Sequence, residues 1–213
     1  MTMLDTADSR HWSKRADRYD AATTCIVGAR TLAAAQSWLR GQVRATDVAL
    51  EIGCGTGLYS AVIAESAQHL TAIDISAEML AGAQARLCAF PNVELKRADA
   101  LQVPYLEAAF DVVFMANLLH IVPAPDAILR ECHRVLKPGG RLLVLDATLV
   151  GMPAIARLAM ALRYLSRFGV PPRTNKNFDL DELADLIRQS NFEIKDAQLL
   201  KQESCTLCLC AVK

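Results

Sequence analysis

A short apolar run followed by three alternate glycines constrains this chain more than any other feature of the sequence. Residues 48–57 read V-A-L-E-I-G-C-G-T-G, so an apolar segment leads into Gly53, Gly55 and Gly57. Glycine tolerates the backbone of a sharp turn and lets the main chain approach a ligand closely. The segment therefore predicts a strand, a tight loop and a following helix, with a nucleotide-like ligand held at the loop.

The glycine spacing argues against a dinucleotide. The dinucleotide fingerprint, G-x-G-x-x-G, needs a third glycine that lets the following helix pack closely on its strand. The required position is Leu58 when counted from Gly53, and Ser60 when counted from Gly55. An NAD-dependent oxidoreductase on a related fold is therefore the alternative rather than the favoured interpretation.

Strand-like and helix-like segments alternate from residue 48 onward, the pattern of a wound α/β sheet. The expected strands are 48–52, 70–74, 93–97, 110–116, 141–147, 193–200 and 204–212, and the expected helices are 58–66, 77–87, 124–136 and 180–190. Ser76 is the expected N-cap of one helix, and Asp179 with Glu182 forms the capping pair of another. K137-P-G-G140 is expected to end a helix and turn into the fifth strand.

Two further helical stretches flank this alternation. Residues 9–41 are expected to form an N-terminal helical cap, and residues 149–177 a helical insert after the fifth strand. Residues 45–147 would be the cofactor-binding core, and residues 178–213 would add a C-terminal helix and strands. Because 213 residues can bury a single large core, we expect one domain. Its fold is predicted as a doubly wound, Rossmann-like, mostly parallel seven-stranded sheet with helices on both faces.

Composition excludes several classes of protein. The net charge of zero provides no electrostatic footprint for nucleic acid. No apolar stretch reaches transmembrane length and the start lacks a secretory pattern, so a cytoplasmic protein is expected. Its seven cysteines are then interpreted as reduced thiols. Cys205, Cys208 and Cys210 fit a half-buried strand and lack the partners of a metal site, so no metal is predicted.

Five segments occur in an order and spacing typical of one family. They are Glu51 to Gly57, the acid-ended second strand, A98-D99-A100, F110-D-V-V-F-M-A-N117 and H133-R-V-L-K-P-G-G140. Together they resemble the class I S-adenosylmethionine (SAM) dependent methyltransferases, and the last segment is typical of the small-molecule branch. The likeness covers residues 45–147 well and the C-terminal strands loosely. It implies SAM as cofactor and methyl transfer to a small molecule.

The resemblance implies that the glycine loop contacts SAM. The backbone from Gly53 through Cys54 and Gly55 to Gly57 is expected against the methionine portion and the ribose. Glu51 is expected to attract the ammonium group of the cofactor, directly or through water. The alternative for Glu51 is a carboxylate that only stabilises the turn.

The resemblance also assigns roles at the ends of the second and third strands. Asp74 is expected to accept both ribose hydroxyls, with a plain helix cap as the alternative. Ile75 is expected on the adenine face or simply in the core. Asp99 would accept a hydrogen bond from the adenine amino group and Ala100 would donate its backbone N–H, unless A-D-A is only a turn.

Two more residues are expected at the cofactor. Asn117 ends the fourth strand, where its backbone or amide would face the transferred methyl. Tyr19 belongs to W12-S-K-R-A-D-R-Y-D20, which resembles the N-terminal stretch of many small-molecule methyltransferases. An aromatic residue of that stretch often lies over the cofactor, and ordinary helix packing is the alternative.

His120 is the candidate catalytic residue. A histidine three residues after Asn117 could take a proton from an attacking oxygen or nitrogen at neutral pH. A structural histidine in the loop is the alternative, because positioning alone can accelerate an in-line methyl transfer. His11 and His133 are weaker candidates.

The insert at residues 149–177 is where such a family holds its acceptor, together with the N-terminal helices. Its Met, Leu, Tyr and Phe residues favour a hydrophobic or aromatic acceptor methylated on oxygen or nitrogen, and the alternative is a lid that buries its leucines against the sheet. Arg157, Arg163 and Arg167 are too few to predict contact with a membrane surface. A monomer and a homodimer both stay open, as does a non-catalytic SAM-binding protein.

Overall fold

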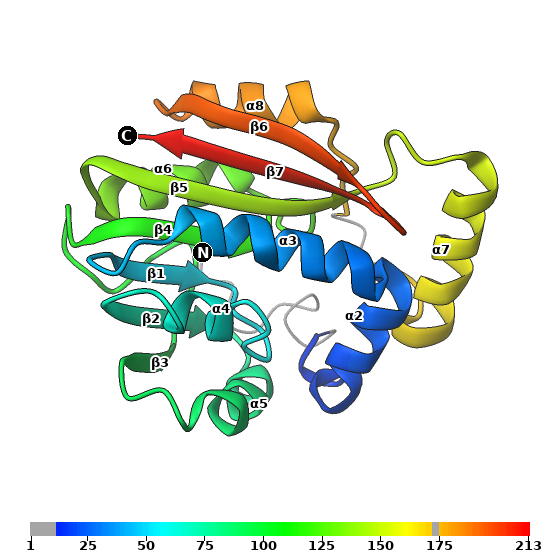
Figure 1. Ribbon diagram of the computed structural model, residues 1–213, viewed down its shortest axis with the longest axis horizontal. Coiled ribbons are helices and arrows are strands. Elements are labelled where there is room, and N and C mark those ends of the chain that lie inside the picture. Colours follow the sequence, from blue (N-terminus) through cyan, green and yellow to red (C-terminus); the bar gives the residue numbers. More distant parts are fainter. Residues whose placement is uncertain (1–11, 172–174) are drawn as a thin grey trace.

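A seven-stranded sheet forms the centre of the molecule (Figure 1). The computed structural model describes residues 12–171 and 175–213. The strands are β1 (Val48–Ile52), β2 (His69–Asp74), β3 (Val93–Arg97), β4 (Phe110–Ala116), β5 (Leu136–Thr148), β6 (Glu193–Lys201) and β7 (Cys205–Val212). Their order is β3-β2-β1-β4-β5-β7-β6. Strands β1 to β5 are parallel and β7 is antiparallel to both of its neighbours, which confirms the predicted mostly parallel sheet.

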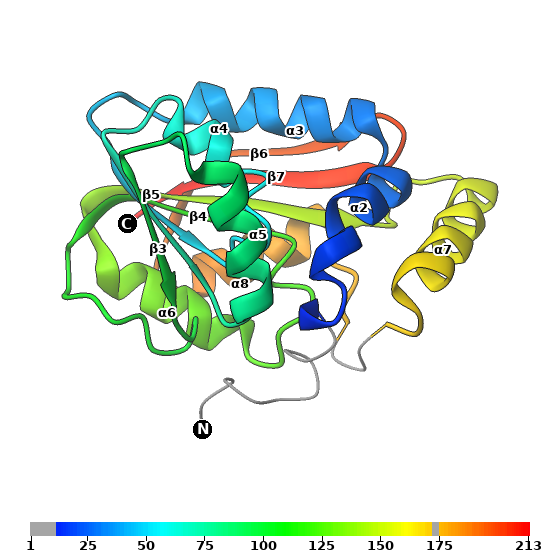
Figure 2. The ribbon, with the colours of Figure 1, turned by 90° about the horizontal axis from the view of Figure 1, so that it is seen from below.

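Helices cover both faces of the sheet (Figure 2). They are η1 (Ala16–Arg18), α2 (Tyr19–Val27), α3 (Ala29–Gln42), α4 (Ser60–Ala64), α5 (Ala77–Leu87), α6 (Pro125–Val135), α7 (Ala154–Phe168) and α8 (Leu180–Gln189). The two predicted caps are confirmed: the Ser76 hydroxyl accepts a hydrogen bond from the Met79 N–H, and Asp179 and Glu182 form a capping box. The predicted N-terminal cap is broken at Gly28, whose φ of 93° separates α2 from α3.

Successive residues of the central strands pack on opposite faces of the sheet. Leu50 of β1 and Val113 of β4 pack with α6 and α8, whereas Ala49 and Val112 pack with α3 and α4. All four side chains are fully buried. A sheet covered on both faces explains why its strands are nearly continuous apolar runs.

Residues 137–140 lie inside β5 and not in a turn that precedes it. β5 begins at Leu136, which pairs with Phe110 at the start of β4, and Gly139 has a φ of +75°. The register shifts between Phe110 and Val112, which accommodates the extra residues. Pro138 and Gly139 signal a turn locally, and the backbone does bend at Gly139, but pairing with β4 makes this bend a bulge within the strand.

The strand predicted around the C-terminal cysteines is confirmed as β7, but it is not half-buried. Cys205, Cys208 and Cys210 are all buried, together with the residues between them. The reason is position, because β7 lies between β5 and β6 and contacts α3 and α8. Burial raises the pKa of the Cys208 thiol to about 12, so this thiol behaves as an apolar group.

No helix in the described part of the chain combines the length and apolar character needed to cross a membrane.

Candidate functional site

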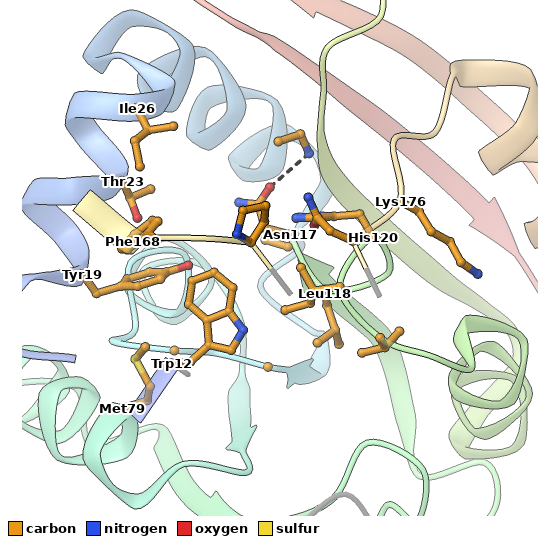
Figure 3. Close-up of a pocket in the computed structure, with 18 of the residues that line it drawn as sticks. Trp12, Tyr19, Thr23, Ile26, Met79, Asn117, Leu118, His120, Phe168 and Lys176 are labelled. Atoms are coloured by element: carbon orange, nitrogen blue, oxygen red, sulfur yellow. Dashed lines mark hydrogen bonds between the residues drawn. The ribbon is translucent and has the colours of Figure 1, made fainter. Parts of the chain in front are cut away.

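A cavity of about 450 Å³ lies at the carboxyl ends of the central strands (Figure 3). From β1 the chain continues to β2 on one side, whereas β4 continues to β5 on the other. The loops that follow β1 and β4 therefore diverge and leave a crevice, as expected where the strand order reverses. Strand-end residues form one wall of the cavity, and α2, α7 and residues 175–177 form the rest.

Gly53 and Gly55 bring main chain to the wall of the cavity. Both have positive φ, +74° and +55°, in the left-handed region that favours glycine. A Cβ added at Gly55 would find only the ring of Tyr19 within 4 Å, at 3.9 Å. The loop thus presents bare backbone beside an aromatic side chain.

Three residues expected at the cofactor do not line the cavity. Glu51 is buried at the end of β1 and accepts a hydrogen bond from the Ser60 hydroxyl. Burial raises the pKa of Glu51 to about 8, although the bond from Ser60 opposes the shift. Cys54 packs in the core on the α3 and α4 side, and Gly57 lies against α5, where an added Cβ would approach Leu87 to 3.1 Å. Their contacts with a cofactor stay predictions.

Two acids, the half-buried Asp74 and the buried Asp99, line one end of the cavity. Asp74 accepts hydrogen bonds from the backbone N–H groups of Gly55 (2.9 Å) and Ser76 (2.8 Å), one on each carboxylate oxygen. Burial raises the pKa of Asp74, and these bonds oppose the shift. Asp99 accepts a hydrogen bond from the Leu101 N–H at 2.9 Å. The Asp74 carboxylate retains acceptor capacity, because an ionised carboxylate offers about four lone-pair sites.

Apolar side chains surround the two acids. Ile75 and Ala100 line the cavity together with Ile73, Met79 and Ala98, and the contacts expected of Ile75 and Ala100 with the cofactor stay predictions. This end therefore combines open glycine backbone, two carboxyl groups and apolar walls. That combination fits the ribose and adenine of SAM, which offer hydroxyl and amino donors and a flat apolar ring.

His120 lines the same cavity and is held by Asp146 of β5. The Nδ1 atom of His120 is hydrogen-bonded to Asp146 Oδ1, and the His120 backbone N–H donates to Asp146 Oδ2 at 3.1 Å. Asp146 is fully buried, whereas the His120 side chain lines the cavity. Burial lowers the pKa of His120, but the charge and hydrogen bond of Asp146 outweigh it, so the pKa is raised. With Nδ1 engaged, Nε2 is the nitrogen available to the cavity.

Asn117 ties the end of β4 to β5 at the centre of the cavity. Its backbone N–H donates to Leu145 O at 2.8 Å, and its side-chain oxygen accepts from the Ala147 N–H at 3.1 Å (Figure 3). Its φ of 52° is unusual for a residue other than glycine. These bonds hold its amide group in the cavity wall.

An aromatic cluster closes the other side of the cavity (Figure 3). Tyr19 of α2 stacks on Phe168 of α7, with ring centroids 5.8 Å apart. Trp12 meets both rings edge-on, and Tyr164 meets Phe168 in the same way. Burial raises the pKa of Tyr19 to about 12, so its hydroxyl stays protonated. Such rings suit a flat apolar ligand or a cationic sulfonium.

Sequence reasoning missed several of these residues. Asp146 stands out in retrospect as the lone acid of the apolar run R141-L-L-V-L-D-A147. Phe168 and Lys176 belong to the predicted insert, but no pattern in the sequence brings them to the cavity. His133 instead packs against Phe192, with ring centroids 5.2 Å apart. His11 lies outside the described residues.

Comparison with known proteins identifies the family. The chain matches a methyltransferase domain over residues 50–144. It is 30% identical to a demethylmenaquinone methyltransferase of Staphylococcus epidermidis over 156 residues, 72% of this chain and 64% of the relative. It is 38% identical to a 27-O-demethylrifamycin SV methyltransferase of Amycolatopsis mediterranei over 116 residues, 53% of this chain and 43% of the relative. The chain thus spans less than two thirds of either relative.

A solved structure extends the likeness to nearly the whole chain. A SAM-dependent methyltransferase from Thermotoga maritima superposes with a TM-score of 0.73 at 20% identity, over 96% of this chain and 99% of that one. At this identity the likeness shows the shared fold. Taken together with the matched domain and the named relatives, it shows that this chain belongs to the class I SAM-dependent methyltransferases.

Proposed function

We propose that this protein transfers a methyl group from SAM to an oxygen or nitrogen of a small hydrophobic or aromatic acceptor. The observation that carries the proposal is the pairing of His120 with buried Asp146 in the same cavity as Asp74 and Asp99. A cavity that only bound SAM would not need a histidine held in this way. The names of the two relatives support the reaction class.

The acid-lined end is the proposed cofactor site. The free lone pairs of Asp74 would accept the ribose hydroxyls, and Asp99 would accept the adenine amino group. Ile75 and Met79 would pack on the adenine ring, and Gly55 would let the cofactor lie close to the main chain. When bound, SAM supplies a methyl group activated by its sulfonium.

His120 is the proposed general base. Asp146 fixes Nδ1, so Nε2 would take the proton from an acceptor hydroxyl or amine as the nucleophile attacks. The charge of Asp146 stabilises the resulting imidazolium, which matches the raised pKa of His120. Since the cavity is lined mostly by aromatic and aliphatic groups, the acceptor would be held by apolar contact beside this base.

Calorimetric titration with SAM and with its demethylated product, S-adenosylhomocysteine, tests the cofactor site. The wild-type protein is expected to bind both ligands, and Asp74→Ala to weaken both affinities by more than about tenfold because charged hydrogen bonds are lost. Asp185→Ala, an exposed acid of α8, is the matched control and should change nothing. Absence of binding, or equal affinities in the two variants, would contradict the proposal.

Methyl-labelled SAM incubated with a cell metabolite extract tests the reaction. The wild-type protein is expected to label a small organic product, and His120→Ala to label it at least about a hundredfold more slowly. Tight SAM binding without any labelled product would instead support the non-catalytic alternative.

A further inference from the structure

Exposed large apolar side chains gather at one place on the described surface. Six of the seven lie within residues 150–170, and the seventh is Leu106 on the loop before β4. The six are Val150, Ile155, Leu158, Leu162, Leu165 and Val170. Ile155 is the most exposed of them, at 85%. A concentration of this kind on a water-exposed surface marks an interaction site.

Four of these residues form one stripe along α7. Ile155, Leu158, Leu162 and Leu165 follow at intervals of three and four residues, which places them on one side of a helix. We call these four residues the α7 stripe. The alternative that the insert buries its leucines against the sheet is wrong, because α7 stands at the edge of the molecule beside α2 (Figures 1 and 2).

The opposite side of α7 packs against the rest of the protein. Met160 and Phe168 are buried against α2, and both line the cavity. Arg163 donates a hydrogen bond to the Cys25 carbonyl of α2 at 3.0 Å. The helix is therefore held in an orientation that leaves Ile155, Leu158 and Leu162 in solvent, whereas Leu165, 48% exposed, also borders the cavity.

The charged residues of the segment that carries the stripe are all basic. Residues 149–171 contain Arg157, Arg163 and Arg167 and no acidic residue, although the whole chain has no net charge. Arg157 and Arg167 are exposed. Apolar side chains with basic and no acidic neighbours are typical of helices that lie in the interface of an anionic membrane.

This charge decides between two occupants of the stripe. A second copy docked through the same face would bring the exposed Arg157 and Arg167 of both copies close together, with no acidic residue of residues 149–171 to pair with them, which costs energy. Anionic headgroups would instead neutralise the arginines while acyl chains cover the leucines. We propose that α7 binds the surface of an anionic lipid bilayer through the α7 stripe.

Membrane binding would have a consequence for the acceptor. Because α7 also forms a wall of the cavity, the bound helix would place the cavity within about 10 Å, one helix diameter, of the lipid. An apolar acceptor dissolved in the bilayer would then have a short path to His120. Only this consequence rests on the proposed function, since lipid binding itself requires neither cofactor nor acceptor.

Co-sedimentation with vesicles tests the proposal. The full chain is mixed with vesicles of phosphatidylcholine alone, or of equal parts phosphatidylcholine and phosphatidylglycerol. The wild-type protein is expected to bind the anionic vesicles more strongly, and Leu158→Ser/Leu162→Ser to bind them about tenfold or more weakly. Leu106→Ser is the matched control, since Leu106 is 84% exposed but distant in sequence from α7. Arg157→Gln/Arg167→Gln should reduce the preference for the anionic vesicles.

The substituted side chains are exposed, and the leucines and Ile155 make no polar contact. The variants should therefore fold, and circular dichroism would verify this. In a second measurement, Ile155→Trp should show a blue shift of tryptophan emission with anionic vesicles that the wild-type protein lacks. Equal vesicle binding by wild type and double leucine variant, or no binding at all, would overturn the proposal. So would a dimer in sedimentation analysis that Leu158→Ser/Leu162→Ser abolishes, because the stripe would then serve a second copy. SAM titration of the same samples reports on the proposed function separately.

Discussion

At the scale of single residues, two opposing influences set the protonation of His120. Burial favours the neutral imidazole, whereas the adjacent charge of Asp146 favours the imidazolium and prevails. A general base must be neutral to accept a proton. Methyl transfer should therefore increase as pH rises through the pKa of His120, which lies above the ordinary value of 6.5.

Asp146→Asn tests this arrangement, because asparagine keeps the shape of the side chain but removes its charge. The pKa of His120 should fall, so the acid limb of the kcat profile should move to lower pH. The plateau should fall by about tenfold or more, since the ring is no longer held in its productive tautomer. Profiles measured at saturating SAM would show the shift, and an NMR titration of the His120 ring would show it without turnover. An unchanged acid limb would exclude His120 as the base.

His120 is identifiable in the sequence as a candidate base, but Asp146 is not identifiable as its partner. The two residues are brought together by the parallel pairing of β4 with β5, in which Ala116 lies opposite Leu145. Nothing in the local sequence of either strand specifies that register. The same holds for Tyr19 and Phe168, whose rings meet only because α7 packs on α2.

At the scale of elements, the glycine loop has a packing role as well as a site role. Gly55 faces the cavity, but Gly57 contacts α5, where its missing Cβ makes room for Leu87 and Ala83. Its φ of +80° also lies in the region that favours glycine. The third glycine thus sets the distance between the loop and the helix that follows β2.

Gly57→Ala should accordingly destabilise the protein by about 1–3 kcal/mol, through backbone strain and the contact with Leu87. Gly41→Ala is the matched control, because nothing lies within 4 Å of the added Cβ in helix α3. It should stabilise the protein by up to about 1 kcal/mol, since alanine is the better helix former. Urea denaturation of both variants measures these changes. A Gly57→Ala protein as stable as Gly41→Ala would contradict the packing role.

Helices and strands that are specified by short local sequence patterns are predicted closely from the sequence. The strand at 48–52, the helix at 77–87 and the capping box at Asp179 follow from short apolar runs and cap residues. Residues 137–140 and the burial of β7 are not recovered, because strand pairing and position within the sheet decide them. The exposure of the α7 stripe likewise depends on where the helix packs.

At the scale of the whole molecule, the stability of the fold should depend on a proton held far from the surface. Glu51 is buried beside Ser60, and its pKa is raised from 4.5 to about 8. The folded protein therefore binds this proton more tightly than the unfolded chain does. The stabilisation is fully present below the ordinary pKa of glutamate and is lost as pH rises through about 8.

Glu51→Gln should remove this dependence, because the amide stays neutral at every pH and keeps the shape of the side chain. Between pH of about 5 and about 8 the wild-type protein should lose on the order of 3 kcal/mol relative to the variant. Urea denaturation without cofactor at several pH values measures the difference. Glu107→Gln, an exposed residue, is the control and should follow the wild-type curve. If the free energy of unfolding of wild type and of Glu51→Gln changed with pH in parallel, Glu51 would be ionised in the folded protein. The end of β1 would then carry a buried negative charge.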